Sequence, residues 1–133
     1  MQARTVLITG ASAGIGRELS KVFAREGHDL VLVARSKDKL KALANTLSDR
    51  YGIEAVPLAR DLSRPDAPGA LFTAVERLGI QVDVLVNNAG ILSDGNFANT
   101  GWDRYVELLQ VNVMAPAALT HLFLPSMLDR GHG

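Results

Sequence analysis

A glycine-rich turn between an apolar run and a helical pattern constrains the fold of this chain more than any other feature. The run Thr5-Val6-Leu7-Ile8 is continuous rather than alternating, which is typical of a strand that is buried on both faces. The turn that follows reads Thr9-Gly10-Ala11-Ser12-Ala13-Gly14-Ile15-Gly16 and opens a helical pattern. A strand, a tight glycine turn and a helix in this order predict the first unit of a parallel sheet.

The same alternation of strand and helix continues along the chain. Apolar runs predict strands at residues 4–9, 29–34, 54–58 and 82–86. Each is followed by apolar residues at helical spacing: Ile15, Leu19, Val22 and Phe23; Leu40, Leu43, Ala44 and Leu47; Leu71, Ala74, Val75 and Leu78; Trp102, Val106, Leu109 and Val113. Consecutive βα units indicate an α/β fold, a doubly wound parallel sheet with helices on both faces. We expect one domain over residues 1–133 that stops after about four βα units, where a fifth strand would follow.

Composition narrows the classes of function. The chain has 14 basic and 14 acidic residues, so nothing predicts attraction to nucleic acid or to a membrane surface. Cysteine is absent, which excludes disulfides, thiolate metal sites and cysteine nucleophiles. The three histidines lack neighbours that would suggest a metal site. No apolar stretch approaches the roughly 20 residues of a membrane span, and we expect a cytoplasmic protein without a metal.

The glycines of the turn match the needs of a phosphate-binding loop. Gly10 would permit the sharp turn, Gly14 would leave room for a pyrophosphate, and Gly16 would let the helix pack close to the sheet. The first helical residues, Ile15 among them, have free N–H groups that favour an anion. Ser12 can donate a hydrogen bond to a phosphate. A glycine turn without a ligand is the alternative, and the position between a strand and a helix argues against it.

The spacing T-G-x-x-x-G-I-G resembles the short-chain dehydrogenase/reductase family. Further motifs of that family follow in order, covering essentially the whole chain: Asp61-Leu62 after the third predicted strand, Asn87-Asn88-Ala89-Gly90 after the fourth, and Asn112 in the fourth helix. The resemblance implies a Rossmann-like fold. It also implies an oxidoreductase that transfers a hydride between a nicotinamide cofactor and a carbonyl or alcohol substrate, and a homo-oligomer.

The resemblance also implies roles for the residues after the third and fourth strands. Asp61 would accept a hydrogen bond from the adenine amino group, and the Leu62 N–H would contact a ring nitrogen. A role in the turn before Ser63 is the alternative for Asp61. The segment Asn88, Ala89 and Gly90 lies at the sheet edge where ligands bind, so the cofactor ribose could rest on its backbone. Asn87 is interpreted as structural, bonding neighbouring strands through its amide.

The end of the second strand favours NADP(H), with NAD(H) as the open alternative. NAD-binding members often place an acidic residue here, and this chain has Ala34 followed by Arg35. A guanidinium can pair with a 2′-phosphate and stack on adenine. A solvated charge at a strand end is the other interpretation of Arg35. Ala13 departs from members that carry a basic residue in the glycine loop, and Lys37 and Lys39 are interpreted as ordinary helix surface.

Asn112 is a polar residue in an apolar helical stretch, and Pro116 follows four residues later. Proline has no N–H, so the carbonyl of Asn112 loses its usual helical partner. In the family, this Asn helps to position a water in a proton relay to the catalytic Lys. A helix kink with a merely satisfied side chain is the alternative.

The family's Y-x-x-x-K motif does not occur in this sequence. Tyr51 is followed four residues later by Ala55, and Tyr105 by Leu109. The family's Ser, Tyr and Lys would lie beyond Gly133, so we expect an incomplete domain that is inactive alone and exposes an apolar sheet edge. A catalytically inert nucleotide-binding fragment that acts by association is the alternative function, and a structural α/β interaction domain is a third.

Overall fold

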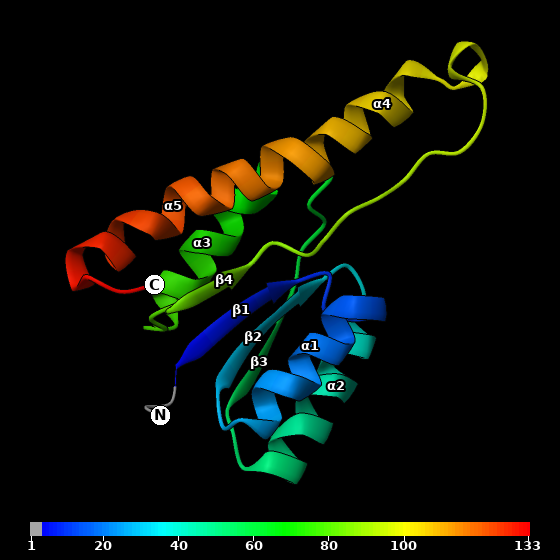
Figure 1. Cartoon of the computed structure of the whole chain (residues 1–133). Coiled ribbons are helices and arrows are strands. Elements are labelled where there is room, and N and C mark those ends of the chain that lie inside the picture. The colour runs from blue at the N-terminus through cyan, green and yellow to red at the C-terminus, as the bar shows by residue number, and fades with distance from the viewer. Residues whose placement is uncertain (1–3) are drawn as a thin grey trace.

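The computed structural model describes residues 4–133 and contains a parallel sheet of four strands (Figure 1). The strands are β1 (Thr5–Thr9), β2 (Asp29–Ala34), β3 (Ala55–Ala59) and β4 (Val84–Val86). Their order in the sheet is β3-β2-β1-β4, and every neighbouring pair is parallel. This arrangement confirms the predicted Rossmann-like α/β fold. The strand β4 lies at an edge of the sheet, as the sequence predicted.

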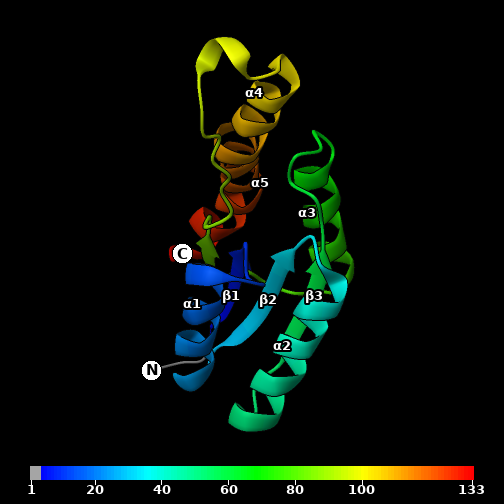
Figure 2. The ribbon, with the colours of Figure 1, turned by 90° about the vertical axis from the view of Figure 1, so that its right-hand side faces the viewer.

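Helices cover both faces of the sheet (Figure 2). One face carries α1 (Gly14–Arg25) and α2 (Lys37–Tyr51). The other carries α3 (Ala67–Arg77) and a long helix that comprises α4 (Trp102–Leu109), a π-helical segment η2 (Gln110–Met114) and α5 (Ala115–Arg130). A short 3₁₀ helix, η1 (Phe97–Asn99), lies in the loop between β4 and α4.

Two apolar layers hold the helices to the sheet, because side chains alternate between the faces of a strand. Val6 and Ile8 of β1 pack with the layer under α1 and α2, whereas Leu7 packs with the layer under α3 and α5. All three are fully buried. Burial on both faces explains why the central strands are continuous apolar runs in the sequence.

The helix α1 buries small residues rather than its large apolar ones. Its buried positions are Gly16, Ser20 and Ala24, whereas Ile15 and Val22 are 73% and 43% exposed. The helical spacing of the apolar residues therefore predicted the helix, but it did not predict which residues the helix buries. Small side chains four residues apart allow the helix to lie close to the sheet, and the buried Ser20 hydroxyl donates to the Gly16 carbonyl at 2.7 Å.

The apolar residues used to predict the fourth helix also point away from the core. Trp102, Val106, Leu109 and Val113 are 48–69% exposed, and we call these four the outer stripe. The buried side chains of the long helix are Val111, Ala115, Leu119 and Phe123. The α4 portion extends beyond the carboxyl ends of the strands (Figure 1).

The long helix from Trp102 to Arg130 meets a simple length and composition criterion for crossing a membrane. The sequence interpretation that no stretch approaches this length was therefore wrong. The criterion is weak, because core helices of soluble proteins also meet it. The expected absence of a membrane partner stays a prediction.

Replacing Gly16 with alanine should destabilise the chain. The new Cβ would lie 2.2 Å from the Gly10 carbonyl oxygen, so backbone must shift, and we expect a loss of about 1–3 kcal/mol. Gly69 is the matched control, because it lies in α3 with nothing within 4 Å of an added Cβ. Gly69→Ala should be neutral or stabilise by about 0.5–1 kcal/mol. Urea unfolding measures both, and equal effects would contradict this account of the turn.

Candidate functional site at the carboxyl ends of the strands

The chain reverses its direction of travel across the sheet between β1 and β4. It runs outward from β1 to β2 and β3, and then crosses to the far side of β1. In open α/β sheets, ligands bind beyond the carboxyl ends of the strands at such a point. A cavity of about 360 Å³ lies there, and its walls include the predicted residues Gly10, Ser12, Arg35, Asp61, Leu62, Ala89 and Gly90.

The glycine turn has the conformation that its sequence predicted. Gly10 and Gly14 have φ angles of +66° and +52°, which side-chain-bearing residues rarely adopt. Gly16 lies so close to the Gly10 carbonyl that no side chain fits. A Cβ on Gly14 would meet nothing within 4 Å, so the space beside this residue is open.

The N-terminus of α1 lacks the partners that helix starts usually have. Its N-cap residue, Ala13, makes no side-chain cap, and the first turn holds no acidic residue. The helix α2 differs, because Ser36 accepts from the Lys39 N–H at 3.5 Å and Asp38 lies in the first turn. The first N–H groups of α1 are therefore available to an anion. Gly14, Ile15 and Gly16 form this first turn.

Thr9 and Asn88 join the ends of β1 and β4. The Asn88 side-chain amide donates to the Thr9 carbonyl at 3.0 Å and to the Gly10 carbonyl at 3.4 Å. The Thr9 hydroxyl oxygen accepts from the backbone N–H groups of Asn88 and Ala89 at 3.0 and 2.9 Å. Sequence reasoning missed Thr9, although a threonine at the buried end of an apolar strand was the available signal.

Asn88 therefore has the strand-bridging role that was expected of Asn87. The Asn87 amide instead donates to the Thr120 hydroxyl of α5 at 3.1 Å. The interpretation of Asn87 as a bridge between strands was wrong, because its side chain points toward the helix layer. The polar atoms of both residues hold neighbouring elements at the carboxyl edge.

Asp61 is held by the turn that follows β3. Its Oδ1 atom accepts from the Ser63 hydroxyl at 2.7 Å and from the Ser63 N–H at 3.0 Å. These hydrogen bonds lower the pKa of the Asp61 carboxyl, and the positive charge of Arg35 lowers it further. The structure therefore confirms that Asp61 has a role in the turn before Ser63. The contact with adenine stays a prediction for Asp61 and for the buried Leu62.

Three basic side chains surround the end of β2. Arg35 lines the cavity, as do Lys39 of α2 and Arg60 after β3. Lys39 is an exposed residue of α2, as expected, and it also lines this cavity. Arg60 was not singled out, because a basic residue after a strand is common in sequences. Its backbone N–H donates to the Ala34 carbonyl at 2.9 Å, which places it beside Arg35.

Asn112 lies within the π-helical segment and positions the segment after Gly90. Its Oδ1 atom accepts from the Ile91 N–H at 2.9 Å, and its amide donates to the Ile91 carbonyl at 2.7 Å. The amide oxygen and the amide nitrogen of the Asn112 side chain therefore both bond the backbone of Ile91. Pro116 cannot donate to the Asn112 carbonyl, and π-helical turns are frequent at functional sites. The helix irregularity that the sequence suggested at Asn112 is therefore present, as a π-helical turn.

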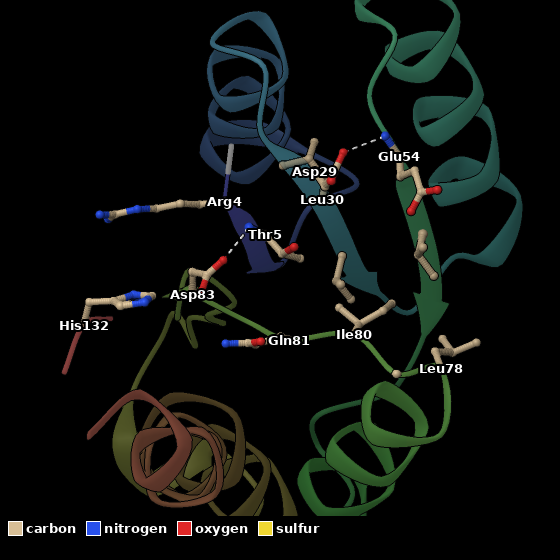
Figure 3. Close-up of a pocket in the computed structure, with 13 residues that line it drawn as sticks. Arg4, Thr5, Asp29, Leu30, Glu54, Leu78, Ile80, Gln81, Asp83 and His132 are labelled. Atoms are coloured by element: carbon tan, nitrogen blue, oxygen red, sulfur yellow. Dashed lines mark hydrogen bonds between the residues drawn. The ribbon is translucent and has the colours of Figure 1, made fainter. Parts of the chain in front are cut away.

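A larger cavity, about 700 Å³, lies at the amino ends of the strands (Figure 3). Two of its acidic side chains, those of Asp29 and Asp83, accept hydrogen bonds from the chain's own backbone. Asp83 accepts from the Thr5 N–H at 3.0 Å, and Asp29 accepts from the Glu54 N–H at 2.8 Å. Asp83 also pairs with Arg130 at 3.3 Å, which ties the end of α5 to β4. These contacts stabilise strand starts, so we place the functional site at the carboxyl edge.

The fold and its carboxyl edge define a Rossmann-like α/β protein, in which a glycine turn lies where the strand order reverses. The sequence profile of the short chain dehydrogenase family matches residues 4–133. The chain therefore belongs to the short-chain dehydrogenase family.

Relatives and solved structures agree with this assignment. A short chain dehydrogenase of Pseudocercospora fijiensis (strain CIRAD86) is 39% identical over all of this chain and 43% of its own length. The ketoacyl reductase HetN of Nostoc is 35% identical over 46% of its length. A short-chain dehydrogenase from Sphingobium yanoikuyae, solved in complex with NADPH, has a TM-score of 0.91 and 40% identity, with 98% of this chain and 50% of that chain covered.

A second solved structure, L-sorbose reductase from Gluconobacter frateurii complexed with NADPH and L-sorbose, has a TM-score of 0.91 and 32% identity. The match covers 98% of this chain and 49% of that one. The chain spans about half the length of the relatives it matches.

Ser63→Ala should raise the pKa of Asp61 toward its ordinary value of 3.8, because the largest cause of the lowering is the Ser63 hydroxyl. The folded-state pKa is depressed, so Asp61 contributes stability above the ordinary pKa that is lost as the pH falls through the lowered value. A carboxyl NMR titration measures the shift, and Ser126→Ala on α5 serves as the control. An unchanged Asp61 pKa in Ser63→Ala would contradict this assignment.

Proposed function

We propose that residues 1–133 are the NAD(P)-binding Rossmann domain of an NADP(H)-dependent oxidoreductase, without the C-terminal catalytic part. The complete enzyme would transfer a hydride between the nicotinamide and a carbonyl or alcohol substrate. The observation that carries this proposal is the uncapped start of α1 beside the open face of Gly14. An anion is the missing partner of such a helix start, and a pyrophosphate meets that need.

The residues present fit a dinucleotide along the carboxyl edge. Gly10, Ser12, Gly14, Ile15 and Gly16 would hold the pyrophosphate through backbone N–H groups and the Ser12 hydroxyl. The cofactor would supply the hydride when it is bound. The rest of the proposed site would bind the adenosine and ribose moieties, and it comprises Arg35, Asp61, Leu62, Asn88, Ala89 and Gly90.

Arg35 supports NADP(H) over NAD(H) in this proposal. It follows β2 at the cavity wall, where a 2′-phosphate would accept from a guanidinium. The Sphingobium and Gluconobacter enzymes were solved with NADPH, and a metagenomic short-chain oxidoreductase with 35% identity was solved with NADP. NAD(H) remains the second cofactor to test.

Asn112 is the residue of this chain that we assign to the chemistry. Its side chain holds Ile91. Its backbone carbonyl receives no hydrogen bond from position 116, because proline has no N–H. We propose that this carbonyl positions a water in the proton relay. The proton donor itself would belong to a longer chain. The alternative, an inert nucleotide-binding fragment that acts by association, uses the same cofactor site.

We further propose a cytoplasmic homo-oligomer without nucleic acid or membrane partners. The zero formal net charge supports the absence of a nucleic-acid partner. The exposed outer stripe of the long helix supports self-association, because exposed apolar surface favours contact with a second copy.

Arg35→Asp should abolish the preference for NADPH. The carboxylate would repel a 2′-phosphate, so NADPH affinity should fall by at least about tenfold while NADH binding is retained. Bound-cofactor fluorescence measures both affinities. Lys41→Asp on α2 makes the same charge change outside the cavity and should have a much smaller effect. Equal losses in the two variants would contradict a direct role for Arg35.

The purified 133-residue chain should bind NADPH without catalysing carbonyl reduction, because it contains no Tyr-x-x-x-Lys motif. Absorbance of NADPH in the presence of a panel of aldehydes and ketones measures turnover. Robust turnover by the pure chain would show that its own residues supply the proton. That result would overturn the proposal that this chain binds the cofactor while a longer chain supplies the proton donor.

A further inference from the structure

A second arginine lines the cavity at the carboxyl edge, and it comes from a different strand end. Arg35 follows β2, and Arg60 follows the neighbouring strand β3. The Arg60 N–H donates to the Ala34 carbonyl at 2.9 Å, so the two arginines emerge from adjacent points of the sheet edge. Both line the same cavity, with Ser12 and Ser36.

The Arg60 side chain is half-buried and partly held in place. Its Nη1 atom donates to the Ala59 carbonyl at 2.7 Å. That contact leaves Nε and Nη2 without a partner among residues 4–133. A guanidinium fixed by one hydrogen bond loses less side-chain freedom when it binds an anion through the others.

Three cations and two carboxylates line this cavity: Arg35, Lys39, Arg60, Asp61 and Glu107. Among residues 4–133, neither Arg35, Lys39 nor Arg60 forms an ion pair. Glu107 pairs with Arg104 at 2.8 Å, so Asp61, which interacts with the charge of Arg35, is the one other carboxylate of the cavity lining. The cavity therefore has an excess of positive charge that the chain itself does not neutralise.

We propose that Arg60 is a second specificity-determining residue, which binds the cofactor 2′-phosphate together with Arg35 from the end of the neighbouring strand. A phosphate monoester carries a charge of about −1.5 to −2 near pH 7. The single positive charge of Arg35 would therefore leave part of that negative charge unbalanced. The glycine loop has Ala13 and offers no cation. Arg60 supplies the second positive charge from β3, and Lys39 adds long-range attraction. This inference rests on the proposed function.

The test compares Arg60→Gln with the wild-type 133-residue chain, using NADPH, NADH, 2′,5′-ADP and 5′-AMP as probes. Arg60→Gln should weaken NADPH and 2′,5′-ADP by about tenfold and leave NADH and 5′-AMP unchanged, because a charged hydrogen bond to the 2′-phosphate is lost. Arg60→Lys, which keeps the charge, should retain part of the preference. Arg64→Gln removes an exposed arginine outside the cavity and is the matched control.

The outcomes separate this inference from the proposed function. An unchanged NADPH to NADH ratio in Arg60→Gln, with the ratio lost in Arg35→Asp, overturns the role of Arg60 and leaves the proposed function standing. Equal weakening of NADPH and NADH in Arg60→Gln also overturns it, because it shows a general loss of the fold or site. Wild-type chain that binds none of the four probes overturns both.

Discussion

The contact between the Gly10 carbonyl and Gly16 fixes how closely α1 approaches the sheet, and the site depends on that approach. A side chain at Gly16 would overlap both this carbonyl and the Asn88 amide. The same amide donates to the Gly10 and Thr9 carbonyls. Strand β1, its turn, α1 and the end of β4 are thus joined around one small volume. Because the helix start lies at the end of β1, it follows Ser12 and Ala13, which line the cavity where the strand order reverses.

The fold could be predicted from the sequence because the signals are local. Continuous apolar runs marked the central strands, and glycines marked the turns, where Gly10, Gly27 and Gly52 have positive φ angles in the structure. The faces of the helices could not be assigned from spacing alone. On α1, Ile15 and Val22 share a helical face that is exposed, because the sheet accepts only the small Gly16, Ser20 and Ala24. When a helix has apolar residues on several sides, its sequence alone does not predict which side is buried.

The site could be predicted where a motif fixes backbone geometry, and less well where side chains converge from separate elements. The glycine turn and the carboxyl-edge position of Gly90 followed from sequence. The bonds of Thr9 to the β4 end, of Asn87 to α5, and the approach of Arg60 to Arg35 depend on which strands are neighbours. Strand order is a long-range property, so sequence spacing carried no direct signal for these contacts.

The central claim is that the uncapped start of α1 and the carboxyl-edge cavity form the dinucleotide site. Backbone amide NMR shifts during titration of isotope-labelled chain with NADPH test it most directly. The account predicts the largest changes at Gly10, Gly14, Ile15, Arg35 and Ala89, with saturation. Changes centred on Thr5, Asp29 and Asp83, which line the larger cavity at the amino ends of the strands, would contradict it. The absence of saturable shifts anywhere would contradict it as well.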